Sequence, residues 1–201
     1  MSDTSGWTNM HDNLKESADT WRKVDSEQIA DCEVFTVHKA TFEREKDSEK
    51  ADFFVIKNPD WVNVIGVTKD RRAILIEQYR QGTESMIFEI PGGMVEDGDD
   101  PESTVRRELA EETGFTAGRF ICVGRSYPNP AQQSNTIYHY LALDCAQTDE
   151  VNFDEHESIA TRLVPLQQID ELVHNGTINH SLAVTALYYA QKYLKDEGLI
   201  T

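Results

Sequence analysis

The sequence predicts an α/β fold in which helices flank a mixed β-sheet, with a β-rich arm at the N-terminus. Three observations support this prediction. Between Glu33 and Ile76, β-branched and aromatic runs alternate with short turns. A helix with clear end signals follows at Asp100–Gly114, and two further helical segments occupy residues 165–195. At 201 residues the chain has room for one domain with an appendage. We therefore divide it into residues 1–57, the arm and its strands, and residues 58–201, the main domain.

The individual strands are expected where β-branched and aromatic residues cluster between turn residues. The first 30 residues are polar and mixed in charge, and we expect them to form a partly helical arm. The expected strands cover residues 34–42, 53–56, 62–67, 73–76, 120–123, 136–143 and 159–164.

The helices are predicted from residues that start and stop them. Asp100 can cap the first helix, Pro101 suits its first position, and Gly114 is a natural stop. A second helix is expected to begin at Pro165 and to run through Val173. The last is expected at Ser181–Lys195, where apolar residues recur at helical spacing.

The charge balance argues against several classes of partner. The chain has 36 acidic and 19 basic residues, a net charge of −17, which repels nucleic acid and anionic membranes. We therefore expect neither DNA-binding regulation nor membrane association. No apolar run approaches the roughly 20 residues needed to span a bilayer, and the N-terminus does not resemble a secretory signal. Three scattered cysteines suit a reducing compartment, so we expect a cytoplasmic protein.

The helix after Asp100 carries the most informative charges. Glu108, Glu111 and Glu112 stand at i, i+3 and i+4, so all three fall within an arc of about 100° on one face. Like charges at this spacing destabilise a helix, and a divalent cation among them would remove that cost. Oxygen ligands favour Mg²⁺ or Mn²⁺ over zinc. Arg107 lies four residues before Glu111 and can hold its carboxylate. The alternative is a solvated acidic face.

The residues around this face favour the metal site. A glycine loop at Glu89–Gly93 precedes the helix and allows close approach of backbone to a ligand. Val105 and Leu109 form an apolar stripe beside the acidic arc, which would hold the helix against a core.

From Gly93 to Phe115 the chain reads G-x5-D-x7-R-E-L-A-E-E-T-G-F. This resembles the Nudix box, G-x5-E-x7-R-E-U-x-E-E-x-G-U, in which U is a bulky apolar residue. Eight of nine positions match, and the departure is Asp99, where the family usually has Glu. The resemblance implies a Nudix fold, an α/β/α sandwich with a mixed sheet. It also implies Mg²⁺-dependent hydrolysis of a nucleoside diphosphate linked to another moiety.

The resemblance also implies roles for particular residues. The metal ligands would be the carboxylates of Glu108, Glu111 and Glu112, with the backbone carbonyl of Gly92 as a further ligand.

The match extends beyond the box to the ADP-ribose pyrophosphatase branch. Glu77–Arg80, Phe88–Gly93 and the tail Asp154–Ile159 are similar to that branch, whereas the loop Tyr127–Asn135 departs from it at Ala131 and Asn135. The implied reaction converts ADP-ribose to AMP and ribose 5-phosphate.

The branch also places a glutamate near the attacking water. The resemblance makes Glu157 the first choice for the general base and Glu155 the second, while Glu108 could serve instead. Arg80 is expected to pair with a phosphate or a terminal ribose, or else to be a surface arginine at a strand end. The implied substrate-binding residues are Arg80, Glu89 and Gly93.

Several alternatives remain open from the sequence. The substrate could be a nucleotide sugar or a nucleoside triphosphate, and the module could bind a nucleotide without hydrolysing it. The intact carboxylates argue against a silent module. Phe42, Phe53 or Trp61 could stack on the base, although strand aromatics are usually core residues. We also expect a homodimer with residues 1–57 in the interface, because the apolar residues of this region sit beside an arm too polar to fold alone; its aromatic residues include Phe35, Phe42, Phe53 and Phe54.

Overall fold

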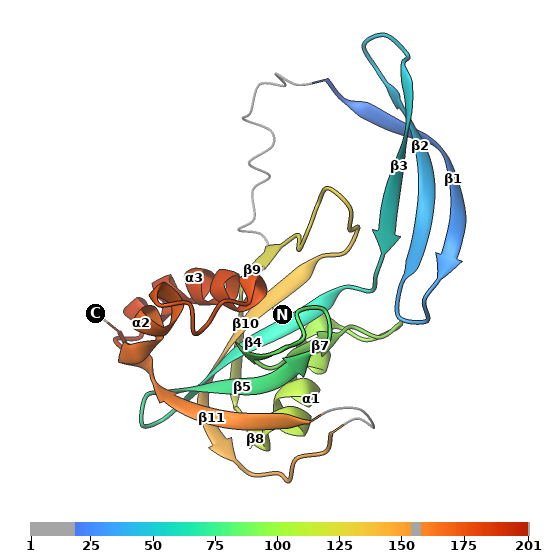
Figure 1. Ribbon diagram of the computed structural model, residues 1–201. Coiled ribbons are helices and arrows are strands. Elements are labelled where there is room, and N and C mark those ends of the chain that lie inside the picture. Colours follow the sequence, from blue (N-terminus) through green and yellow to red (C-terminus); the bar gives the residue numbers. More distant parts are fainter. Residues whose placement is uncertain (1–18, 154–157, 201) are drawn as a thin grey trace. The chain divides into compact units, whose positions relative to one another are not determined.

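The computed structural model describes residues 19–153 and 158–200 (Figure 1). The chain divides into two compact units, one reaching to Lys57 and the other beginning at Asn58. Each unit is described separately below.

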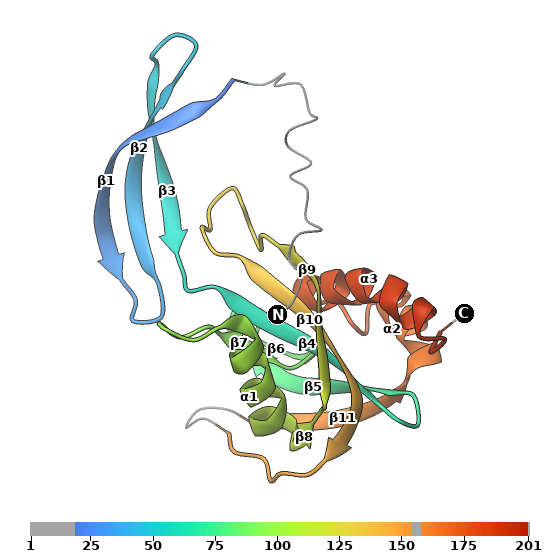
Figure 2. The ribbon, with the colours of Figure 1, turned by 180° about the vertical axis from the view of Figure 1, so that it is seen from behind.

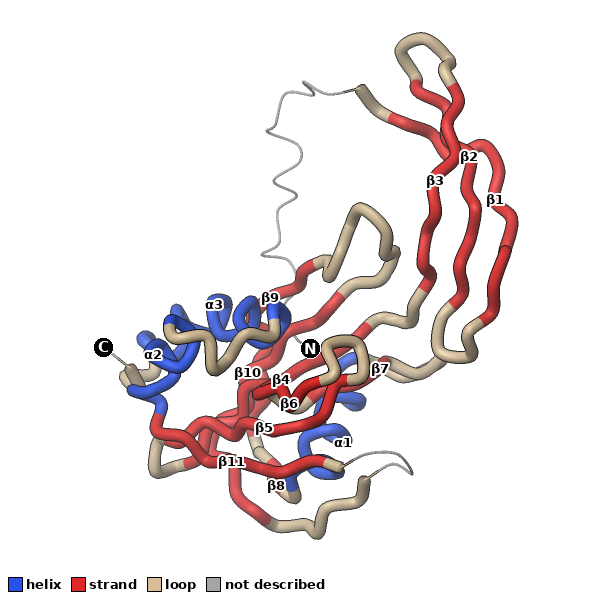
Figure 3. The backbone as a smooth tube through the Cα atoms, viewed as in Figure 1, coloured by secondary structure: helices blue, strands red, loops and turns tan. Residues whose placement is uncertain are grey.

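The first unit contains a three-stranded antiparallel sheet in the order β1-β2-β3 (Figure 3). Its strands are β1 (Trp21–Asp31), β2 (Thr36–Arg44) and β3 (Lys50–Lys57). The expected partly helical arm is therefore wrong for the stretch that forms β1, and residues 1–18 lie outside the described residues. The reason is nonlocal. β1 pairs with β2 from Trp21↔Arg44 to Asp31↔Thr36, and most of its side chains are exposed, so no alternating pattern marks it in the sequence.

The second unit is built on an eight-stranded mixed sheet. Its strands are β4 (Trp61–Thr68), β5 (Arg72–Arg80), β6 (Ser85–Glu89), β7 (Gly92–Met94), β8 (Phe115–Thr116), β9 (Arg119–Ser126), β10 (Ile137–Gln147) and β11 (Ile159–Pro165). The main order is β11-β5-β4-β10-β8, with β6 on β5, β7 on β4 and β9 on β10. The β4–β10 pair is parallel and the other pairs are antiparallel. The predicted mixed sheet is confirmed, whereas the short strands β6, β7 and β8 were not expected.

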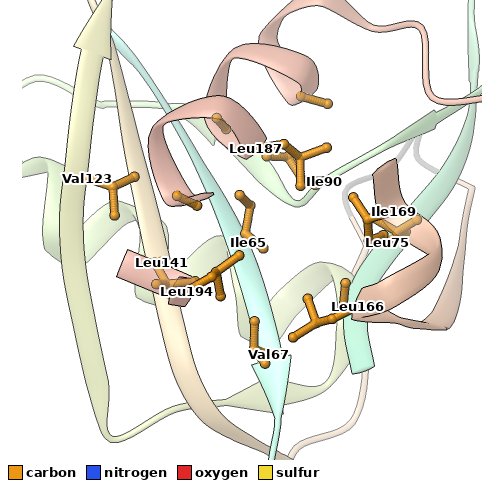
Figure 4. Close-up of a cluster of buried hydrophobic side chains, with 14 of the residues drawn as sticks. Ile65, Val67, Leu75, Ile90, Val123, Leu141, Leu166, Ile169, Leu187 and Leu194 are labelled. Atoms are coloured by element: carbon orange, nitrogen blue, oxygen red, sulfur yellow. The ribbon is translucent and has the colours of Figure 1, made fainter. Parts of the chain in front are cut away.

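Helices cover both faces of this sheet, with α1 on one side and α2 and α3 on the other (Figures 1 and 2). Alternation along β4 produces the two cores. Val62 and Val64 pack in the cluster that contains α1 residues, while Ile65 and Val67 pack in the cluster of α3. Figure 4 shows this second cluster, in which Ile65 and Val67 of the sheet lie among residues that include Leu187 of α3. The α/β/α sandwich is confirmed.

The helices begin and end largely where local sequence predicts. Helix α1 (Pro101–Thr113) is capped by Asp100, whose side chain accepts from the backbone N–H groups of residues 102 and 103, and it ends at Gly114 with φ of 71°. Helix α3 spans Ser181–Asp196. Pro165 ends β11, opposite Arg72, instead of opening a helix. A short 3-10 turn (Leu166–Gln168) separates it from α2 (Ile169–His174). Within the described ranges, no helix combines the length and apolar character that crossing a bilayer requires.

Candidate active site

A cavity of about 410 Å³ lies in the second unit, where the starts of β4 and β10, strand β7, the middle of α1, and the residues just before and inside α3 meet. Arg107 and Glu108 of the Nudix-like helix contribute to its wall, as does Glu89 at the end of β6. Trp61, at the start of β4, supplies an aromatic surface. The cavity thus combines acidic, basic and aromatic groups.

The acidic face of α1 is tied to the glycine segment before it. Glu112 is 3% exposed, and its Oε2 accepts a hydrogen bond from the backbone N–H of Gly92 at 3.0 Å. A Cβ on Gly93 would lie 2.5 Å from the carboxyl carbon of Glu108, so only glycine leaves that carboxylate its present place. A Cβ on Gly92 would clash with the backbone oxygen of Val62, because β7 runs close against β4. Gly93 therefore leaves room for the Glu108 carboxylate, whereas Gly92 allows β7 to pack closely against β4.

Arg107 organises the other carboxylates. Its Nη1 lies 3.2 Å from Glu108 Oε1 and 3.2 Å from Glu111 Oε2, and its Nη2 lies 3.8 Å from Glu96 Oε1. The expected pairing of Arg107 with Glu111 is present. The guanidinium also reduces the mutual repulsion of carboxylates at i and i+3.

The donor set of this helix suits a hard divalent cation. Glu108, Glu111 and Glu112 offer only oxygen atoms on neighbouring positions of one helix, which Mg²⁺ and Mn²⁺ prefer. As the side chains lie, no three His, Cys, Asp or Glu residues in the described part of the chain are arranged to hold a metal ion. Two of the carboxylates, those of Glu108 and Glu111, also contact the Arg107 guanidinium.

A second polar group occupies the cavity wall contributed by β5, β6 and the residue before α3. Glu89 is 3% exposed and accepts two hydrogen bonds from Arg80, Nε to Oε1 at 2.6 Å and Nη2 to Oε2 at 2.9 Å. His180 Nδ1 lies 3.3 Å from Glu89 Oε2. Burial lowers the pKa of His180; Glu89 opposes this effect and Arg80 adds to it. This wall therefore carries a buried carboxylate between two basic side chains.

Asn63 lies between this group and the core. Its Nδ2 donates to the backbone oxygen of Leu182 at 3.3 Å, and its Oδ1 lies 2.8 Å from His139 Nδ1. The other ring nitrogen of His139 lies 2.8 Å from Ser126 Oγ. Because Oδ1 can only accept, His139 Nδ1 carries the proton and Nε2 accepts from the serine. Burial lowers the pKa of His139 to about 4, so the ring is neutral and fixes the orientation of the Asn63 amide.

The structure brings many of the predicted site residues together. Five of them line the cavity: Arg80, Glu89, Gly92, Gly93 and Glu108. Glu111 and Glu112 lie on the same helix without lining it. The two candidates for the base in the 154–157 stretch, Glu155 and Glu157, lie outside the described residues.

Of the three aromatic residues considered for stacking on the base, Trp61 lines the cavity. Phe42 and Phe53 belong to the first unit, where their rings pack edge to face with centroids 5.6 Å apart.

Sequence reasoning missed two polar residues of the wall, Asn63 and His180. Asn63 is a polar residue inside the apolar run Val62–Val67, which could have marked it. No local pattern distinguishes His180, because it reaches Glu89 only through the fold.

Known proteins resemble this chain in sequence and in fold. The model of the NUDIX domain matches residues 57–185. The chain is 32% identical over 138 residues to an ADP-ribose pyrophosphatase of Bacillus subtilis (strain 168), covering 68% of this chain and 75% of the relative. It is 30% identical over 138 residues to a methanol dehydrogenase activator of Bacillus methanolicus, with the same shares of 68% and 75%.

A solved structure titled "Crystal structure of ADP compounds hydrolase" shares the fold, with a TM-score of 0.81 at 24% identity, covering 92% of this chain and 100% of the other. Residues 57–185, which include the box helix, account for more than half of this chain. The chain therefore belongs to the NUDIX domain family, and it is an enzyme of that family, a Nudix hydrolase.

Proposed function

We propose that this enzyme hydrolyses a nucleoside diphosphate linked to another moiety, with ADP-ribose as the first candidate, and that it requires Mg²⁺ or Mn²⁺. The observation that carries the proposal is the position of Glu108, which is held by Arg107 and lies against Gly93 in the cavity wall. The ADP-ribose pyrophosphatase of Bacillus subtilis supports the choice of substrate. The products would be AMP and ribose 5-phosphate.

The residues that would hold the metal are those of the acidic helix face and the loop before it, namely Glu108, Glu111, Glu112 and the carbonyl oxygen of Gly92. When bound, the cations supply positive charge beside the diphosphate and lower the pKa of a water molecule. The N–H of Gly92 donates to Glu112, and this bond holds the loop against the helix. Arg107 contacts both Glu108 and Glu111 and so restrains these two carboxylates on one face of α1.

Arg80 and Glu89 would position the substrate. Arg80 lines the cavity and its side chain is about half exposed, so its charge can face an anionic group while Glu89 holds its orientation. In the reaction, the water oxygen bonds to one phosphorus and the bridging P–O bond breaks. The proton of the water passes to a general base, and the bridging oxygen leaves with the other phosphate.

On the basis of the sequence, we propose Glu157 as the general base and Glu155 as the second choice. Glu108 is the alternative among the residues that the structure describes. If Glu157 is the base, Glu157→Gln should lower kcat strongly and change KM little, because the residue acts on the water and not on the substrate. Glu155→Gln, at the same Mg²⁺ concentration, should do much less. Equal and mild effects of the two substitutions would assign the base to Glu108.

The experiment that tests the function is a substrate panel with product masses. ADP-ribose, a nucleotide sugar and a nucleoside triphosphate are incubated with Mg²⁺, with Mn²⁺, or with EDTA. We expect ADP-ribose to give AMP and ribose 5-phosphate fastest, and EDTA to abolish turnover. Preference for another member of the panel would reassign the substrate, and undiminished turnover after metal removal would refute the metal requirement.

We also propose that the enzyme is a homodimer with residues 1–57 in its interface. The support is the apolar surface of the three-stranded sheet, where Phe53 and Phe54 are 44% and 59% exposed. No role for nucleic acid or membrane is proposed.

A further inference from the structure

His180 is a wall residue of the cavity to which neither the box nor the glycine loop assigns a role. It directly precedes α3, 35% of its side chain is exposed, and its Nδ1 is 3.3 Å from Glu89 Oε2. The groups beside it, Glu89 and Arg80, determine which nitrogen of its ring carries the proton.

The proton of the neutral imidazole lies on Nδ1. Glu89 is ion-paired through both oxygens with Arg80, and a carboxylate can only accept hydrogen bonds. A lone pair on Nδ1 would repel the carboxylate oxygen 3.3 Å away, so the neutral ring carries its proton on the nitrogen that faces Glu89 and keeps its lone pair on Nε2. Burial and Arg80 both lower the pKa of His180, which favours this neutral form against the effect of Glu89. Within the described chain, the contact with Glu89 is the one polar contact of this ring.

The wall around His180 presents both donors and acceptors. Arg80 offers N–H groups and Glu89 offers carboxylate oxygens. The side-chain amide of Asn63 donates a hydrogen bond to the backbone oxygen of Leu182, in the first turn of α3. A phosphate oxygen only accepts, so it is a poor partner for a lone pair on Nε2. A hydroxyl group both donates and accepts, and it suits a wall of this mixed character. The ligand groups that match are the vicinal hydroxyls of a ribose.

We propose that His180 is a substrate-binding residue whose Nε2 accepts a hydrogen bond from a ribose hydroxyl while Glu89, held by Arg80, fixes the ring. The identity of the ligand rests on the proposed function. Because the hydroxyl takes no part in the bond that breaks, this contact contributes to binding of ground and transition states alike.

The test is His180→Leu, which removes both ring nitrogens and leaves the backbone at the start of α3 intact. We expect KM for ADP-ribose to rise about tenfold, the factor that one lost hydrogen bond can supply, with kcat changed less than about twofold. His174→Leu is the matched control, since this exposed histidine makes its polar contacts with Asp170 of its own helix in the described part of the chain. His180→Ala, which also removes the acceptor, serves as the second variant if the leucine variant fails to fold. An unchanged KM in a folded His180 variant contradicts the proposal.

Deoxy analogues separate direct contact from a structural effect. The wild type and the His180 variant are compared on ADP-ribose and on two analogues, each lacking the hydroxyls of one ribose. The increase in KM caused by the substitution should vanish on one of the two analogues. That analogue also identifies which ribose His180 binds. A penalty that persists on both overturns the proposal. If the wild type does not hydrolyse ADP-ribose at all, the proposed function fails instead, so the two failures are distinguishable.

Discussion

Gly93 occupies a position where any side chain would meet the carboxyl group of Glu108. The obstacle is the far end of a flexible side chain, which can move aside at little cost to the fold. At Gly92 the obstacle is the backbone oxygen of Val62, which cannot move without separating β7 from β4. Adjacent glycines therefore have different consequences, one for the placement of a site carboxylate and the other for stability.

Gly93→Ala should lower kcat by up to about 10²-fold while the melting temperature stays close to that of the wild type, because displacing a positioned group by about 1 Å carries such a cost. Gly92→Ala should instead lower the melting temperature. Gly118→Ala is the control, since a Cβ there has no neighbour within 4 Å. Steady-state kinetics and thermal unfolding of the three variants check this, and a fully active Gly93→Ala would show that Glu108 needs no fixed position.

Glu112 is the most buried of the three carboxylates on the acidic face, and its role can be tested without changing its shape. Glu112→Gln keeps an oxygen that can accept from the Gly92 N–H but removes a negative charge from the proposed metal site. We expect kcat to fall at least about 10²-fold, with the circular dichroism spectrum unchanged. Near-normal turnover at saturating Mg²⁺ would mean that the metal lies elsewhere.

At the scale of elements, strands β4, β9 and β10 are linked to α3 by the chain Asn63–His139–Ser126. His139 is completely buried, and its ring stacks on Tyr189 of α3 with centroids 5.5 Å apart. The ring is buried in its neutral form, because burial lowers its pKa from 6.5 to about 4. Protonation of this histidine therefore opposes the packing of α3 on the sheet.

This predicts a pH-dependent stability of known sign. Between pH 6.5 and about 4 the unfolded chain binds a proton at His139 that the folded chain does not, so the free energy of unfolding falls as the pH falls through this range. The loss attributable to the group approaches about 3 kcal/mol near pH 4. Urea unfolding at several pH values should show a shallower pH dependence for His139→Gln than for the wild type. His174→Gln, at an exposed site, is the control, and identical pH slopes in all three proteins would contradict the assignment.

At the scale of the whole molecule, the first unit leaves several of its aromatic residues exposed. Phe53 and Phe54 are adjacent on β3, so their side chains point to opposite faces of the sheet, yet both are exposed. Trp21 packs edge to face on Phe53, with ring centroids 5.7 Å apart, and is itself partly exposed. A sheet with apolar groups on both faces gains stability by contact with another surface.

Light scattering at micromolar concentration should therefore report a dimer. Phe54→Lys should shift the protein towards the monomer, because it places a charge on the proposed interface. Tyr188→Lys is a control at an exposed aromatic residue of the second unit. A single 22.9 kDa species in the wild type would rule the homodimer out.

The sequence by itself determined the features that depend on neighbouring residues or on the spacing of residues within a motif. Asp100 and Gly114 act on the backbone within a few residues, so the bounds of α1 could be predicted from them. The box spacing identified the family, and runs of β-branched and aromatic residues between turn residues located the main strands.

Tertiary structure decided what depends on contacts between distant residues. β1 is a strand because β2 pairs with it, although its own residues are polar. His180 reaches Glu89 across 91 positions of sequence, and the buried ring of His139 holds Asn63 across 76. No local sequence pattern predicts these contacts, because they form only when the sheet and α3 pack together and exclude water from the groups between them.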